Sequence, residues 1–166
     1  MDKSELRAAL IDNYNRYAQG LDTKDWGMVR GCFSDELALD YGRLGVVTPP
    51  GELFSADAWI AQLQSVINGF DITRHTITNH RFVFTDDEIR CTAYLIADHV
   101  IFPNPEEPEI GPEDVATVVG EYSNCYEQQA DGRWLICASR LDMHWTSGNA
   151  ALIPIAMERA AALAAS

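Results

Sequence analysis

The sequence predicts an α+β fold in which helices come first and a long, curved antiparallel sheet follows. Apolar residues recur three or four positions apart before residue 70, whereas from Asp71 onward they occur in strand-like runs. The turn sequences Asp86-Asp87 and Asp131-Gly132 divide these runs into two hairpins. Helices followed by antiparallel strands are typical of α+β domains. A long, curved sheet with helices on its concave side is expected to enclose a pocket.

The first two helices are expected before residue 34. Residues 4–19 place apolar side chains on one helix face, with Ser4 as a plausible N-cap and Gly20 as a stop signal. A second, shorter helix is predicted over 26–33 from the spacing of its apolar residues.

The remaining elements follow in chain order. We expect a strand at 35–41, a loop at 42–54, a helix from Ser55 or Asp57 to Gly69, and strands at 72–85, 88–102, 115–129 and 133–145. Residues 103–114 hold four prolines and five acids, which indicates a solvated loop or a lid between the hairpins. The alanine-rich tail, residues 149–166, favours a helix outside a main domain of residues 1–148.

Length and charge limit the class of protein. A chain of 166 residues with 47% hydrophobic residues is long enough for one folded core. Its formal net charge of −13 argues against nucleic acid or an anionic membrane as a partner, because phosphates would be repelled. A small neutral or apolar ligand is compatible with this charge.

Targeting and redox signals are weak. The opening residues lack the apolar run of a signal peptide, and no apolar segment approaches the ~20 residues needed to span a bilayer. Cys32, Cys91, Cys125 and Cys137 are far apart, which favours reduced thiols over a zinc or redox site. We therefore expect a soluble, cytoplasmic protein. The sequence also lacks a phosphate loop, a GxSxG or HExxH motif and a dinucleotide fingerprint, so no metal or organic cofactor is expected.

Histidines are the first candidates for chemistry. His75 and His80 lie in the run 72–85, where a histidine is either a core residue or a proton-transfer group. Strict alternation places them on opposite faces of the strand unless a bulge intervenes. His99 has the same parity as an unbroken set of apolar neighbours and is therefore expected to face the interior.

Other candidates have competing interpretations. Asp22 is either the N-cap of the second helix, which its spacing favours, or a carboxylate that orients a histidine. Tyr17 lies on a buried helix stripe and needs a polar partner. Arg140 has the parity of apolar neighbours, so it either points inward to an anionic group or lies on the surface. Three aromatic residues are further candidates for ligand contact: Trp26, Tyr41 and Tyr122.

The order of four local signatures carries a resemblance to a known family. These signatures are Tyr17-x4-Asp22 in YAQGLDTKDW, Thr73-x-His75 in TRHTITNHRF, the strand ending in Ala97-Asp98-His99, and DGRWLICASRLDMHW followed by Gly148-Asn149. With them the chain resembles the SnoaL-like branch of the NTF2-like (cystatin-like cone) superfamily over about residues 5–148. It looks nearest to the members that include scytalone dehydratase, bile-acid 7α-dehydratase and hexachlorocyclohexane dehydrochlorinase.

The resemblance implies a cofactor-independent, dehydratase-like lyase. The Trp, Phe, Leu and Ile side chains expected to wall its pocket indicate a small apolar polycyclic or aromatic substrate. The resemblance assigns His75 as general base, Asp22 as its partner, Tyr17 as an aid to the leaving group and His99 as the second histidine, and this favours the dyad over a helix cap. Arg140 is a looser match to a basic residue that family members carry on the last strand. A non-catalytic ligand-binding or subunit-type cone, and an isomerase or hydrolase using the same pocket, are the alternatives. A trimer or dimer is expected, with Val119 and Met143 as candidates for its interface.

Overall fold

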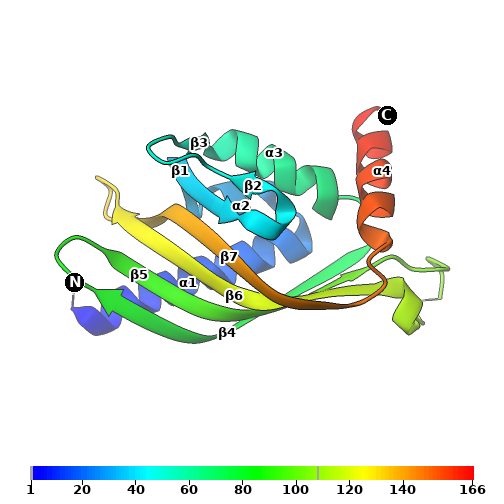
Figure 1. The fold of residues 1–166 in the computed structure, drawn as a ribbon, viewed down its shortest axis with the longest axis horizontal. Helices are drawn as coiled ribbons and strands as arrows, with labels where there is room; N and C mark the ends of the chain where they lie inside the picture. The colour runs from blue at the N-terminus through cyan, green and yellow to red at the C-terminus, as the bar shows by residue number, and fades with distance from the viewer. Residues whose placement is uncertain (1, 108) are drawn as a thin grey trace.

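The computed structural model describes residues 2–107 and 109–166 and has the predicted α+β fold (Figure 1). Helices α1 (Lys3–Thr23), α2 (Trp26–Arg30) and α3 (Ala56–Ile67) pack over the concave side of a curved sheet, and α4 (Leu152–Ala164) stands at one end of it. The strands are β1 (Phe33–Tyr41), β2 (Val46–Val47), β3 (Phe54–Ser55), β4 (Ile72–Phe84), β5 (Ile89–Val100), β6 (Val115–Gln128) and β7 (Trp134–Gly148). Short 3-10 turns occur at Gly42–Leu44 and Pro112–Asp114.

The sheet has the order β2-β1-β7-β6-β5-β4, so β4 forms one edge. Neighbouring strands are antiparallel except β1 and β7, which pair in parallel. Both predicted hairpins are present, as β4–β5 and β6–β7. The described part of 103–114 is a loop ending in the second 3-10 turn, and residue 108 of that prediction lies outside the described residues.

A bulge in β4 resolves the question of which way its histidines point. The pairing with β5 shifts between Thr78 and Arg81, and Asn79 has φ +57°, a left-handed conformation that asparagine tolerates better than most residues. The extra residue changes the alternation. His75 and His80 consequently both point to the concave side, while the residues between them are mostly exposed.

The first helix differs from its prediction at both ends. Asp2 rather than Ser4 is the N-cap, in a capping box with Glu5. The helix also continues past Gly20 to Thr23, and Lys24 ends it in the left-handed conformation. Gly20 is needed for close approach, because a Cβ there would lie 2.7 Å from Val29 Cγ2 of α2.

The start of α2 removes one of the two interpretations of Asp22. Asp25 is the N-cap of this helix, and its side chain accepts a hydrogen bond from the Met28 amide at 2.9 Å. Asp22 lies in the last turn of α1, so the N-cap interpretation is wrong. Phe33, which was assigned to the second helix, instead begins β1.

The C-terminal helix is anchored where α3 joins β4. A Cβ on Gly69 would lie 1.8 Å from the Ala156 carbonyl oxygen, so only glycine permits this approach. The Arg159 guanidinium donates to both carboxylate oxygens of Asp71, at 2.6 and 3.1 Å. A small apolar cluster around Phe70, Ala116, Leu152 and Ala156 completes the contact. The division of the chain at residue 148 stays a prediction.

Candidate functional site

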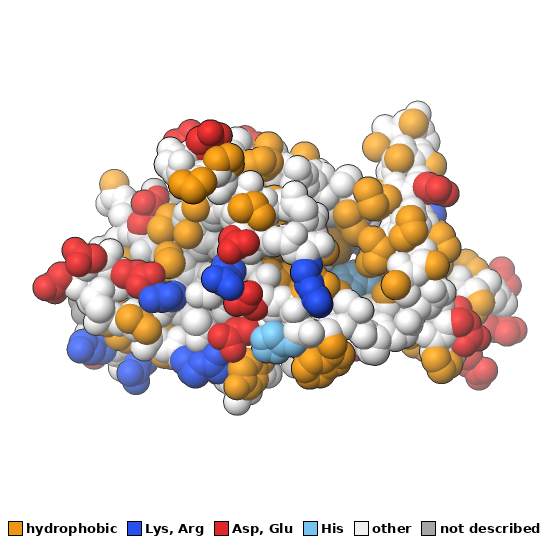
Figure 2. Space-filling view, in the orientation of Figure 1, with side chains coloured by type: hydrophobic (Ala, Val, Ile, Leu, Met, Phe, Trp, Pro, Cys, Tyr) orange, Lys and Arg blue, Asp and Glu red, His pale blue; other side chains and the backbone are white. Residues whose placement is uncertain are grey.

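A cavity of about 590 Å³ lies between the helices and the concave face of the sheet. Its wall is mostly apolar, with contributions from Leu21, Trp59, Leu63, Leu95, Ala97, Val118, Leu141 and Met143. The α4 residues Ile153 and Met157 also line it. Figure 2 shows a hollow beside the α4 side of the molecule, with mainly hydrophobic side chains around it and histidine surface visible inside. The site therefore suits a largely apolar molecule.

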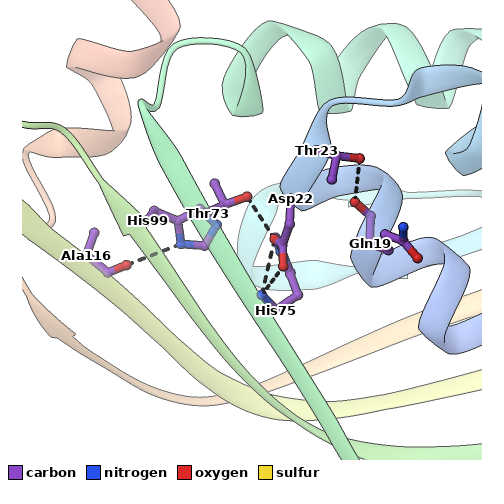
Figure 3. A network of polar contacts seen from close by, with 7 residues as sticks. All are labelled: Gln19, Asp22, Thr23, Thr73, His75, His99 and Ala116. Atoms are coloured by element: carbon purple, nitrogen blue, oxygen red, sulfur yellow. Dashed lines mark hydrogen bonds and ion pairs between the residues drawn. The ribbon is translucent and has the colours of Figure 1, made fainter. Parts of the chain in front are cut away.

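The predicted contact between His75 and Asp22 is present at this cavity (Figure 3). His75 Nδ1 lies 2.7 Å from Asp22 Oδ1, and the His75 and Asp22 side chains are only 5% and 12% exposed. The same carboxylate accepts hydrogen bonds from the His75 backbone amide, at 3.0 Å, and from Thr73 Oγ1, at 2.9 Å. Asp22 thus fixes both the backbone and the imidazole of His75.

This contact depends on where α1 ends and on which strand it meets. Asp22 is in the last turn of α1, and β4 is an edge strand whose one partner in the described part of the sheet is β5. One side of β4 therefore has backbone groups without a strand partner, and the Asp22 carboxylate accepts the His75 amide on that side. The Asp22 side chain therefore both pairs with a backbone donor at the edge of β4 and orients the imidazole of His75, the candidate catalytic residue.

Asp22 is ionised at neutral pH, because its pKa lies below the usual value. Burial alone would raise the pKa of this carboxyl, but the hydrogen bonds from His75 and Thr73 outweigh burial and lower it. A carboxylate can only accept, so His75 donates from Nδ1. Neutral His75 then carries its lone pair on Nε2, the atom through which a histidine in this tautomer can take a proton.

His99 lies beside the dyad, as predicted. It extends from β5 toward the cavity, and its ring centroid lies 5.5 Å from that of His75 and 5.0 Å from that of Phe70. Its Nδ1 lies 3.2 Å from the Ala116 carbonyl oxygen. Burial, with a contribution from nearby His75, lowers the pKa of His99 to about 4.

Three of the predicted aromatic side chains meet at another part of the cavity wall. Tyr17, Tyr41 and Tyr122 are buried and line it. Burial raises the pKa of all three phenols, that of Tyr41 to about 12, so they remain hydrogen-bond donors. The Tyr41 hydroxyl lies 2.9 Å from Ser139 Oγ, which donates to Asn124 Oδ1.

Two predicted ligand contacts do not line the cavity. Trp26 donates from Nε1 to Asn68 Oδ1 at 3.1 Å and lies outside it. Arg140 is on the outer face, where it pairs with Asp142 at 2.8 Å and Asp40 at 3.7 Å. The inward placement of Arg140 is wrong because Cys137 is an extra residue in β7 relative to β6, which changes the alternation.

Val119 and Met143, the two residues predicted for a subunit interface, do not share one face of the sheet. Met143 lines the cavity instead of the outer face, whereas Val119 is in register with Trp145 of β7 and Ile96 of β5. The expected trimer or dimer stays a prediction.

Several residues of the site were not found from the sequence. Thr73 was noticed only as part of a signature, yet its hydroxyl donates to Asp22. Ile153 and Met157 gave no signal, because the composition of the tail indicates a helix without indicating where it docks.

The described residues contain neither a cluster of three or more His, Cys, Asp or Glu side chains suited to a metal ion nor a helix long and apolar enough to cross a membrane.

Fold and cavity together define an α+β cone that encloses a mostly apolar site with a His–Asp contact. The chain belongs to the SnoaL-like domain family, whose profile matches residues 2–140. Among curated proteins, no sequence matches the chain significantly.

Solved structures share the fold over most of the chain. Kfla4162 from Kribbella flavida is 26% identical with a TM-score of 0.75, and the alignment covers 93% of this chain and 99% of that one. A candidate scytalone dehydratase from Novosphingobium aromaticivorans is 19% identical with a TM-score of 0.65, over 88% and 92% of the two chains. Hexachlorocyclohexane dehydrochlorinase LinA-type3 from Novosphingobium barchaimii is 16% identical with a TM-score of 0.68, over 89% and 92%. The NTF2-like cone predicted from the sequence is thereby confirmed.

Proposed function

We propose that this protein is a cofactor-independent lyase that eliminates water from a small, largely apolar fused-ring or aromatic substrate. The observation that carries the proposal is the 2.7 Å contact between His75 Nδ1 and the Asp22 carboxylate at the wall of a 590 Å³ cavity. A dehydrochlorinase and a candidate scytalone dehydratase share this fold, which supports elimination chemistry as the proposal.

The proposed reaction starts at His75. Its Nε2 removes a proton from the carbon next to a substrate carbonyl, and the ionised Asp22 stabilises the imidazolium that forms. The electron pair of the broken C–H bond forms the new C=C bond as the C–O bond to the neighbouring hydroxyl breaks. Tyr17, a neutral phenol at the cavity wall, donates a hydrogen bond to the departing oxygen. This oxygen takes up the proton that His75 Nε2 removed and leaves as water, so that His75 returns to its neutral form.

The proposal is tested with 3-hydroxy-1-tetralone, a bicyclic β-hydroxy ketone that forms 1-naphthol and water on elimination. Formation of 1-naphthol is followed by its absorbance for the wild type, His75→Ala and His80→Ala. General acid–base catalysis typically contributes ~10²–10⁴-fold, so His75→Ala is expected to lose at least a hundredfold in kcat/KM.

His80→Ala is the matched control, since His80 lies on the same face of the same strand but packs its ring 5.2 Å from Tyr14. It is expected to keep most of the turnover. Equal rates for the wild type and His75→Ala would refute the assigned base. Tight binding of the ketone without turnover would instead support the alternative, a ligand-binding cone without catalysis.

A further inference from the structure

We propose that His99 acts as a hydrogen-bond acceptor for a hydroxyl that the ligand retains, and that it does not protonate the leaving group. This inference rests on the proposed function and deepens it by naming a second feature of the substrate. It also separates the two histidines, which both face the cavity, into different roles.

The tautomer of His99 follows from its partner on β6. The Ala116 carbonyl oxygen can only accept, so the hydrogen bond at 3.2 Å requires a proton on His99 Nδ1. In the neutral ring, Nε2 then carries a lone pair and no hydrogen. Nε2 makes no hydrogen bond within residues 2–107 and 109–166, and His99 is one of the polar side chains at the cavity.

The surroundings of His99 keep the ring neutral. The rings of Phe70 and His75 both pack against it. Asp22, the carboxylate beside that pair, is already bonded to His75. Asp98, the adjacent residue, lies on the opposite face of β5 and accepts a hydrogen bond from Thr117 at 2.7 Å. Among residues 2–107 and 109–166, no carboxylate therefore pairs with His99 to hold a second proton, which agrees with its lowered pKa.

The two histidines cannot satisfy one another. Both donate from Nδ1 to the protein, and in their neutral forms both have a bare Nε2, with ring centroids 5.5 Å apart. Because His75 removes the C–H proton in the proposed reaction, its Nε2 does not supply a hydrogen to His99. The ligand must therefore supply the donor for His99 Nε2. A departing hydroxyl must gain a proton, so the hydroxyl that donates to His99 is one that stays on the substrate. The substrate class is thus a hydroxylated fused-ring molecule.

Binding of two naphthalenes tests this inference without turnover. At pH 7, 2-naphthol carries a donor, whereas 2-methoxynaphthalene has the oxygen but no hydrogen to donate. We expect wild-type protein to bind 2-naphthol about tenfold more tightly, as one additional buried hydrogen bond predicts. His99→Asn retains an amide N–H for the Ala116 carbonyl and removes the Nε2 acceptor, so it is expected to reduce this preference to about twofold or less.

Equal affinity of the wild type for both probes, or no binding of 2-naphthol, would overturn the inference. Nitrogen-15 NMR of histidine-labelled wild type gives a second test that requires no variant to fold. It should show neutral His99 with its hydrogen on Nδ1 at pH 7, and a hydrogen on Nε2 would overturn the inference. His75-dependent turnover without a hydroxyl preference would remove this inference alone, whereas the preference without turnover would remove the lyase assignment alone.

Discussion

Replacing Asp22 with asparagine tests the central contact of the site with little change in volume. The carboxylate accepts hydrogen bonds from His75 Nδ1 at 2.7 Å, the His75 amide at 3.0 Å and Thr73 Oγ1 at 2.9 Å. Asparagine has one carbonyl oxygen for these three donors, and its NH₂ group would face at least one of them. The variant therefore loses both a negative charge and a matched set of acceptors.

The expected magnitudes follow from the burial of the pair. Leaving one buried donor unpaired costs about 1–3 kcal/mol, which is the expected loss in the free energy of unfolding. A hydrogen bond to a charged group contributes about 1.5–3 kcal/mol. If that contribution is lost as the His75 imidazolium forms, kcat falls roughly 10- to 150-fold, since each 1.36 kcal/mol is a factor of ten in rate.

Urea unfolding and turnover of 3-hydroxy-1-tetralone measure the two effects. Asp25→Asn is the matched control, because Asp25 caps α2 and asparagine is as good an N-cap as aspartate. This control should change neither quantity appreciably. Wild-type turnover in Asp22→Asn would refute the role of Asp22 in catalysis. An unchanged free energy of unfolding would refute the stabilisation assigned to its hydrogen bonds.

Two further predictions concern the anchoring of α4. Gly69→Ala should destabilise the fold by about 1–3 kcal/mol in urea unfolding, because its Cβ would meet the Ala156 carbonyl oxygen. Gly27→Ala is the control and should not destabilise the fold in this way, because a Cβ there has only an ordinary contact. Equal effects of the two substitutions would contradict this packing. Burial alone would raise the pKa of Asp71, but hydrogen bonds from Arg159 and the Phe102 amide lower it. The stabilisation from Asp71 is therefore present above the unfolded-state pKa of about 3.9 and lost as pH falls through the lower folded-state pKa. The stability difference between the wild type and Asp71→Asn should shrink below pH 4, and a constant difference would contradict it.

The sequence predicts the elements well, and the resemblance predicts the His75–Asp22 contact. Periodicity alone could not bring these residues together, because their proximity depends on the path of α1 across the edge of the sheet. The sequence spacing favoured Asp22 as the N-cap of the second helix, yet the next aspartate, Asp25, caps that helix. The signal for the first cap was available, since Asp2 and Glu5 have capping-box spacing.

Strand faces were the least predictable feature, for a physical reason. One extra residue transfers every following side chain to the other side of a sheet. Asn79 gives a weak signal for the bulge in β4, since asparagine tolerates positive φ, but nothing at Cys137 marks the bulge in β7. The prediction for Arg140 therefore failed, while that for His99 succeeded because β5 pairs with β6 without a shift.

The docking of α4 adds to the cavity wall a part of the chain that is distant in sequence from the His–Asp pair. The His–Asp pair comes from α1 and β4, whereas Ile153 and Met157 belong to a helix beyond the matched residues 2–140. Substitutions at these two positions can reshape the cavity wall without touching either member of the pair. Exchange of this single helix is thus expected to change the shape of the cavity while the His–Asp pair stays unchanged.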